Sequence, residues 1–161
     1  SILNGRTVSG VDLGNLTISD AHIKGMTMRK VVALKARVRN VTFENCVFSK
    51  VDMRYARFEN VAFIRCRFEA VGNPDVVENL ADFSYSKMKD VLFRETAIHD
   101  GWFAGMDGSG GYILLDTVTD IYGRGSRNGW GTVLEGKNIH FRIRNSHIHG
   151  GIQSGSAHSR I

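Results

Sequence analysis

The sequence has few cysteines, a single proline and no long apolar run. Its 161 residues include two cysteines and one proline. Two cysteines are too few for the disulfide framework of a small secreted domain. The longest apolar runs, such as Tyr112-Ile113-Leu114-Leu115, are far shorter than the roughly 18 residues of a membrane-spanning helix. With 42% hydrophobic residues the composition is also not that of a disordered chain. A globular chain of single-domain length remains.

An apolar residue recurs at every fifth position in the first half of the chain. A second apolar series runs two residues ahead of it, from Val11 to Val71, and prefers smaller side chains. A helix has a period of 3.6 residues and an amphipathic strand a period of two, so neither explains this pattern. A coil of short straight segments does, with one large and one small side chain pointing inward before each corner. The large positions are Leu3, Val8, Leu13, Ile18, Ile23, Met28, Ala33, Val38, Phe43, Phe48, Met53, Phe58, Phe63 and Phe68.

Two of these five-residue units are Val41-Thr42-Phe43-Glu44-Asn45 and Ala56-Arg57-Phe58-Glu59-Asn60. They resemble the consensus of the pentapeptide-repeat family, which is a small residue, Asp or Asn, Leu or Phe, and two variable residues. The resemblance covers roughly residues 1–71 and implies a right-handed quadrilateral β-helix with four units per coil. We therefore expect an all-β fold, a right-handed parallel β-helix whose coils widen or are capped toward the C-terminus.

The repeat pattern predicts a single β-solenoid domain over residues 1–161, in four parts. Residues 1–71 are regular repeats. Residues 72–80 contain the only proline, Pro74, and form a loop excursion, after which the pattern resumes in phase over 81–104. Residues 105–161 hold 12 of the 18 glycines and are expected to form less regular β-helix rungs or a cap.

Four units per coil place residues twenty apart directly above one another, at the spacing of about 4.8 Å between neighbouring strands. This stacking predicts columns of side chains along the solenoid. The expected columns are Met28, Phe48 and Phe68; Phe43 and Phe63; and Asn40 and Asn60.

The two cysteines, Cys46 and Cys66, are also twenty residues apart. Their Cα atoms would lie within disulfide range, but parallel inward side chains do not by themselves provide the dihedral angle that a disulfide needs. Cysteine is also a good small apolar filler at such a position. We therefore expect a reduced pair.

The positive charge lies in the repeats. Residues 1–71 contain 12 Lys and Arg against 6 Asp and Glu, a net charge of +6, whereas residues 72–161 contain 9 against 10, a net charge of −1. Two interpretations are a solvated surface and a patch for an acidic partner. The candidate binding residues are Lys30, Arg37, Lys50, Arg54 and Arg57.

The basic charge also bears on the choice of partner. Members of the family that protect DNA gyrase imitate DNA and need an acidic rod, which this chain does not provide. Nucleic-acid binding is disfavoured because exposed aromatic residues are sparse in the basic region, where Tyr55 is the main candidate for stacking. We expect a protein partner, and an acidic surface on that partner is one of the two interpretations of the basic charge. Peripheral membrane contact and the oligomeric state are left open.

The C-terminal third contains the candidates for chemistry. Asp116, Asp120, Glu135 and His147 are the candidate catalytic residues, because two carboxylates can perform the acid and base steps of glycoside hydrolysis. Their spacing is typical of no particular enzyme. His147 and His149 are two residues apart on one side of an expected strand, which gives a two-ligand metal clip. A tight metal site normally needs more protein ligands, so exposed strand histidines are the commoner explanation and no cofactor is expected.

The residues that follow the five-residue repeat point inward and build the core. We therefore expect a non-catalytic recognition or scaffolding role that is carried by an outer face. Pentapeptide-repeat β-helices also occur in effectors delivered by bacterial type III secretion. The resemblance thus implies a protein-binding segment of a bacterial effector that is secreted or delivered to a host cell. The N-terminus shows no secretory signal peptide, and Ser1 in place of methionine suggests a fragment of a longer chain.

Two alternatives stay open. One is a polysaccharide-binding or polysaccharide-cleaving β-helix, with Asp116, Asp120 or Glu135 gathered in a groove beside Trp130. The other is a structural subunit of a phage fibre or surface appendage, which would form a stable homo-oligomer.

Overall fold

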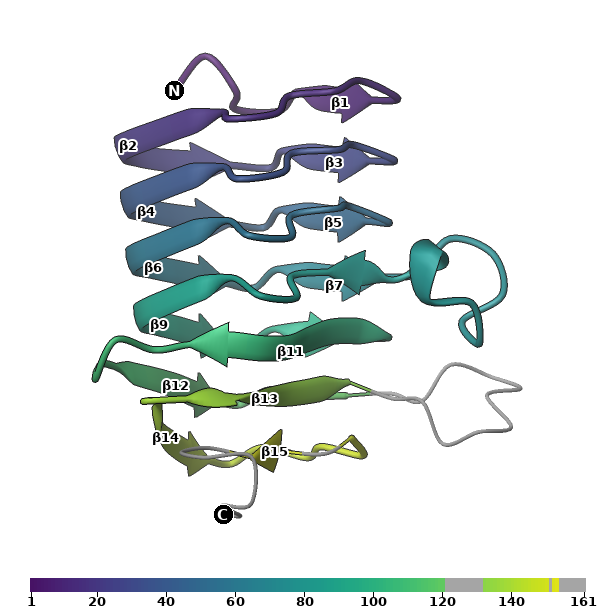
Figure 1. The fold of residues 1–161 in the computed structure, drawn as a ribbon. Helices are drawn as coiled ribbons and strands as arrows, with labels where there is room; N and C mark the ends of the chain where they lie inside the picture. The colour runs from purple at the N-terminus through teal and green to yellow at the C-terminus, as the bar shows by residue number, and fades with distance from the viewer. Residues whose placement is uncertain (121–131, 151, 154–161) are drawn as a thin grey trace.

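The computed structural model describes residues 1–120, 132–150 and 152–153, which form a stack of coils (Figure 1). Every strand pairing in it is parallel, and no described helix is long and apolar enough to span a membrane. The predicted all-β parallel β-helix is therefore confirmed.

Two sheets run the length of the stack. The smaller has the order β1 (Thr7–Ser9), β3 (Thr27–Arg29), β5 (Val47–Ser49), β7 (Arg67–Glu69) and β10 (Ala97–Ile98). The path of the larger is β15 (Ile152–Gln153), β13 (Val133–Lys137), β11 (Gly101–Asp107), β9 (Lys87–Arg94), β6 (Arg57–Ile64), β4 (Arg37–Glu44) and β2 (Thr17–Lys24). Off this path, β12 (Tyr112–Asp116) pairs with β9 and β14 (His140–Arg144), and β8 (Ala81–Asp82) pairs with β11.

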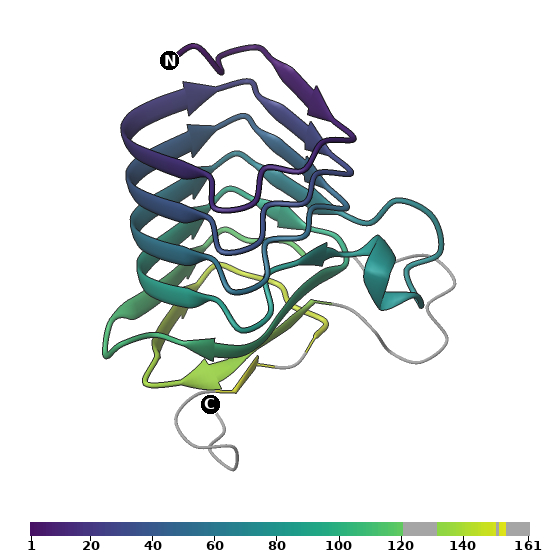
Figure 2. The ribbon, with the colours of Figure 1, turned by 45° about the horizontal axis from the view of Figure 1, so that its top comes forward.

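The corners follow the five-residue period. The eight-residue strands β2, β4, β6 and β9 each bend at a residue with positive φ: Asp20, Asn40, Asn60 and Asp90, with φ between 52° and 58°. Asn and Asp tolerate this left-handed conformation better than other residues with a side chain. Each coil therefore turns sharply without proline (Figure 2).

The core consists of stacked side chains. Phe63 is stacked between Phe43 and Phe93, with ring centroids 5.2 Å and 5.1 Å away, and Phe48 is stacked on Phe68 at 5.0 Å. The register confirms the predicted inner columns, in which Met28, Phe48 and Phe68 align.

The predicted corner column of asparagines is confirmed as a hydrogen-bonded ladder. The Asn60 side-chain amide donates to Asn40 Oδ1 at 3.0 Å, and the Asn40 amide donates to Asp20 Oδ1 at the same distance.

The loop excursion is inserted without loss of phase. Arg37 pairs with Arg57, an offset of 20 residues, whereas Arg57 pairs with Lys87, an offset of 30. The ten additional residues, which include the 3₁₀ helix η1 (Val77–Asn79), project from the stack at the level of β7 (Figure 1). In the next coil Val91 pairs with Ile113, an offset of 22, and the glycine-rich turn between β11 and β12 holds the extra residues.

The cysteines are free and buried, so the predicted reduced pair is confirmed. The Cys46 thiol donates to Ile23 O at 3.5 Å and the Cys66 thiol to Phe43 O at 3.3 Å. The hydrogen bond with Cys46 and burial raise the pKa of the Cys66 thiol, which stays protonated at neutral pH.

The inward and outward positions of one strand give a first test. Phe58 is 2% exposed and its ring contacts Phe63 and Phe83, whereas the adjacent Arg57 points outward. We expect Phe58→Asp to unfold the repeats, because truncating a buried phenylalanine alone costs about 3–5 kcal/mol and a buried charge adds to this. Arg57→Asp should keep the fold and melt at or above the wild-type temperature, because the new carboxylate lies between Arg37 and Lys87. Equal losses of stability in circular-dichroism melts of the two variants would contradict the assignment of faces.

Thiol reactivity gives a second test. Because both side chains are buried and out of reach of the reagent, Cys46 and Cys66 should be labelled by a disulfide reagent far more slowly in the folded protein than in denaturant. Time courses of labelling in the two conditions measure this. Native labelling as fast as that of the unfolded chain would show that the thiols are accessible.

Candidate functional site

The five predicted binding residues divide between two grooves. Arg37 and Arg57 line an open groove of about 410 Å³, which we call the arginine–tyrosine groove. Lys30, Lys50 and Arg54 line a second groove of about 350 Å³, which we call the valine groove. The residues of the arginine–tyrosine groove are Asn15, Lys35, Arg37, Tyr55, Ala56, Arg57, Tyr85, Ser86, Lys87 and Asp107.

A ladder of positive charge runs along the arginine–tyrosine groove. Arg37, Arg57 and Lys87 occupy the same register position at the start of β4, β6 and β9. Neighbouring strands lie about 4.8 Å apart, and like charges in opposed positions destabilise a sheet. In the part of the chain that the structure describes, none of the three forms an ion pair within 4.0 Å. The nearest acidic position in the ladder is Asp107, which pairs with Lys87 at the end of β11.

Two exposed tyrosines line the groove beside this ladder. Tyr55 and Tyr85 are 52% and 58% exposed, and their rings stack with centroids 5.3 Å apart. Gly105 lies against the Tyr85 ring and has a φ of +64°. A Cβ atom at position 105 would be 2.7 Å from that ring. Glycine therefore leaves room for the tyrosine stack.

Sequence reasoning singled out Tyr55 but missed Tyr85 and Lys87. Lys87 pairs with Arg57, and Tyr85 stacks on Tyr55. Each pair is thirty residues apart instead of twenty, because the excursion adds ten residues to one coil. Subtracting the excursion from the numbering would have found them. Together the groove residues offer guanidinium, ammonium and phenol donors to an anionic group.

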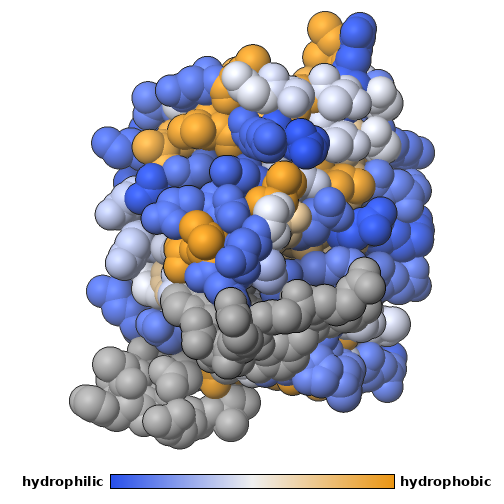
Figure 3. Space-filling model, turned by 90° about the vertical axis from the view of Figure 1, so that its right-hand side faces the viewer, coloured by the Kyte–Doolittle hydropathy of each residue, from blue (hydrophilic) through white to orange (hydrophobic). Residues whose placement is uncertain are grey.

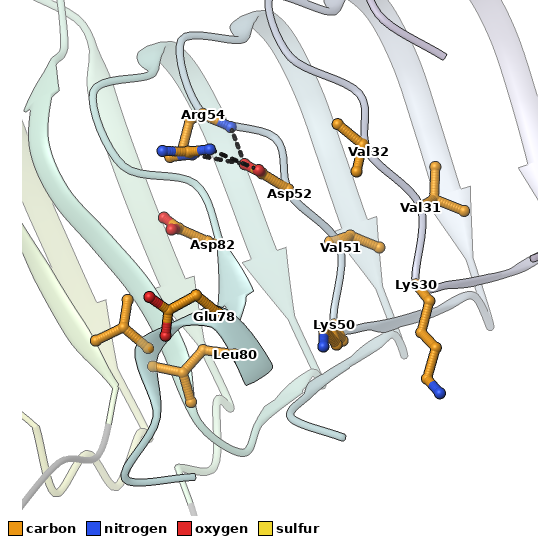
Figure 4. A pocket seen from close by; sticks show the side chains of 11 residues that line it. Lys30, Val31, Val32, Lys50, Val51, Asp52, Arg54, Glu78, Leu80 and Asp82 are labelled. Atoms are coloured by element: carbon orange, nitrogen blue, oxygen red, sulfur yellow. Dashed lines mark hydrogen bonds and ion pairs between the residues drawn. The ribbon is translucent and has the colours of Figure 1, made fainter. Parts of the chain in front are cut away.

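The valine groove is lined by basic and acidic side chains in equal number. Arg54 forms a bidentate ion pair with Asp52, with both nitrogen–oxygen distances 2.9 Å (Figure 4). The Lys50 ammonium donates a hydrogen bond to Asn79 Oδ1 at 3.2 Å. Burial raises the pKa of the nearby Asp82 carboxyl, which accepts hydrogen bonds from Ser84.

The surface around the valine groove is mixed as well. Figure 3 shows small apolar patches among hydrophilic side chains on the face that carries the excursion. Exposed valines contribute to it, including Val32 at 37%. The groove has acidic residues of its own, so it is not part of a continuous basic surface.

The candidate catalytic carboxylates lie on different ladders. Asp116 ends β12, where hydrogen bonds from Thr117 and Arg94 outweigh desolvation and lower the pKa of its carboxyl. Asp120 is buried and accepts from the Thr132 backbone at 3.0 Å. Glu135 lies on β13, which pairs with β11 and β15 rather than with β12.

Neither groove is lined by these three carboxylates, and Trp130 lies outside the described residues. His147 lies beyond β14, where its Nε2 is 3.0 Å from Nε2 of His149. Within residues 1–120, 132–150 and 152–153, no three His, Cys, Asp or Glu side chains are grouped as metal ligands.

Comparison with known proteins identifies the repeats. Residues 35–69 match the family model "Pentapeptide repeats (8 copies)". No curated protein sequence matches the chain. Among solved structures, HetL, a pentapeptide repeat protein involved in heterocyst differentiation regulation from the cyanobacterium Nostoc sp. strain PCC 7120, shares 7% identity with a TM-score of 0.38. The similarity covers 90% of this chain and 73% of HetL.

A second solved structure is QnrB1, a plasmid-mediated fluoroquinolone resistance protein, at 10% identity and a TM-score of 0.26 over 90% of this chain and 84% of that one. The matched segment lies in the part of the stack where β4 pairs with β6 and β5 pairs with β7, each at an offset of 20 residues. The matched repeats and the coils that they build show that residues 35–69 consist of pentapeptide repeats.

Proposed function

We propose that this chain is a non-catalytic recognition module that binds an acidic surface of a partner protein through the arginine–tyrosine groove. The observation that carries the proposal is the ladder of Arg37, Arg57 and Lys87, three cations in one register position without an ion-pair partner within 4.0 Å in the described chain.

The ladder disfavours the free protein and favours a complex. Opposed like charges on neighbouring strands cost stability, and carboxylates of a partner would remove that repulsion while forming charge-assisted hydrogen bonds. The exposed Tyr55 and Tyr85 add rigid aromatic area beside the charges, and aromatic residues and arginine are enriched at protein interfaces.

The proposal includes the setting that the family resemblance implies, a bacterial effector that is secreted or delivered to a host cell. It favours recognition over polysaccharide cleavage, because Asp116 is held by Arg94 and Arg144 while Asp120 is buried. None of the candidate catalytic carboxylates, Asp116, Asp120 and Glu135, lines either groove.

A charge-reversal experiment tests the proposal. We expect Arg37→Glu with Arg57→Glu to weaken binding of poly-L-glutamate, an acidic polypeptide probe, by at least about tenfold at physiological salt. The matched control, Lys30→Glu with Lys50→Glu, changes the same amount of charge in the valine groove and should change binding by less than about twofold, since charges are screened within about 8 Å. Fluorescence anisotropy of labelled probe measures both.

Equal weakening by the two double variants would show that only net charge matters and would contradict a specific groove. Two further probes distinguish the kind of partner: vesicles containing phosphatidylserine and a single-stranded oligonucleotide. Tighter, groove-dependent binding of either one than of poly-L-glutamate would overturn the assignment of a protein partner. Circular-dichroism melts of the variants verify that the fold is kept.

A further inference from the structure

Cations outnumber acidic residues in the arginine–tyrosine groove. Lys35, Arg37, Arg57 and Lys87 line it, and Asp107 is the one carboxylate among its described lining residues. Within residues 1–120, 132–150 and 152–153, no hydrogen bond or ion pair holds the guanidinium group of Arg37 or Arg57. The groove therefore has an excess of positive charge, and its guanidinium donors are available to a ligand.

Asp107 determines which part of the groove an anion can occupy. It pairs in register with Lys87, at one end of the ladder of cations. A hydrogen bond from the Ser109 backbone and the charge of nearby lysines lower the pKa of the Asp107 carboxyl, which is ionised at neutral pH. An anion at Lys87 would be repelled by this carboxylate, whereas the other lining residues are cationic or neutral. The best place for an anion is therefore between Arg37 and Arg57.

Two opposed arginines on neighbouring strands favour a ligand that carries two charges on one group. Arg37 and Arg57 pair directly across β4 and β6, and neighbouring strands lie about 4.8 Å apart. Two separate carboxylates brought this close together would repel each other, as the arginines do. A phosphoryl group on a side chain instead carries about −1.5 to −2 charges and three acceptor oxygens on a single phosphorus atom. It can accept charge-assisted hydrogen bonds from both guanidinium groups at once.

The two tyrosines suit the residues on either side of such a group. The exposed rings of Tyr55 and Tyr85 stack on each other and line the same groove. Their rings offer apolar area to a bound segment, and their hydroxyl groups can donate hydrogen bonds to it. Because the groove is open, a short phosphorylated side chain can reach the arginines.

We propose that the arginine–tyrosine groove binds a phosphorylated serine or threonine of the partner protein, with the phosphoryl oxygens between Arg37 and Arg57 and the flanking residues against Tyr55 and Tyr85. Clusters of arginine are a recurring means of recognising phosphorylated segments. The site is that of the recognition function proposed above, on which this inference rests, and the phosphoryl group is the acidic group that it recognises.

Fluorescence anisotropy with two labelled peptides of one glycine-rich sequence tests the proposal. One peptide carries a phosphoserine, and the other carries two adjacent glutamates, whose charge of about −2 matches that of phosphoserine above its second pKa of about 6. We expect the phosphoserine peptide to bind at least about tenfold more tightly, because one phosphoryl group can reach both arginines. Equal binding of the two peptides would show that charge alone is recognised and would overturn the proposal.

A conservative double variant separates the shape of the guanidinium groups from their charge. Arg37→Lys with Arg57→Lys keeps the charge of the groove but removes the paired N–H donors, so the affinity for the phosphoserine peptide should fall at least about fivefold. The matched control, Arg29→Lys with Arg39→Lys, makes the same change at two exposed arginines that do not line the groove and should bind like the wild type. Equal affinities of the two double variants would overturn the proposal.

Failure of the phosphoryl assignment differs from failure of the groove as a binding site. Equal binding of the two peptides, lost for both in Arg37→Glu with Arg57→Glu, would overturn the phosphoryl assignment alone. Binding of both peptides that is unchanged in that variant would overturn the groove itself. Tighter, arginine-dependent binding of vesicles that contain a phosphoinositide would assign the site to a lipid headgroup and overturn a phosphorylated protein as the ligand.

Discussion

The structure depends on the alignment of residues twenty positions apart in parallel strands. In the regular coils this alignment places each large inward residue on an equivalent one, as in the stacked pairs Phe43–Phe63 and Phe48–Phe68. Aromatic pairs of this kind contribute about 0.5–1.5 kcal/mol each beyond the area they bury. Because each coil contacts only its neighbours, the same alignment that builds the core also fixes which outward side chains stand together.

The outward ladders differ in whether neighbouring side chains attract or repel each other. Asp20, Asn40 and Asn60 form a ladder in which each amide hydrogen-bonds to the next residue, so that it stabilises the corner. Arg37 and Arg57 occupy a ladder of the same construction but repel each other. The binding role that we propose would account for a ladder of like charges, whereas in the valine groove Arg54 is paired with Asp52.

Much of the fold could be predicted from the sequence because one period governs both packing and corners. The columns through Phe48 and Phe68 followed directly from a twenty-residue spacing. The site was predicted less well for two physical reasons. The excursion changes the spacing of Lys87 and Tyr85 from their partners to thirty residues instead of twenty. At a corner of the coil, the adjacent Arg54 and Tyr55 line different grooves.

The central claim is that the ladder of like charges is kept at a cost to the fold. A double-mutant cycle with Arg37→Gln and Arg57→Gln, read out as the free energy of unfolding in urea at low salt, tests this most directly. The account predicts that each single substitution leaves the free protein at least as stable as the wild type, with an unfavourable coupling of about 0.2–1 kcal/mol between the two arginines. Single variants that lose stability, with a favourable coupling between the arginines, would contradict it and make the ladder part of what holds the coils together.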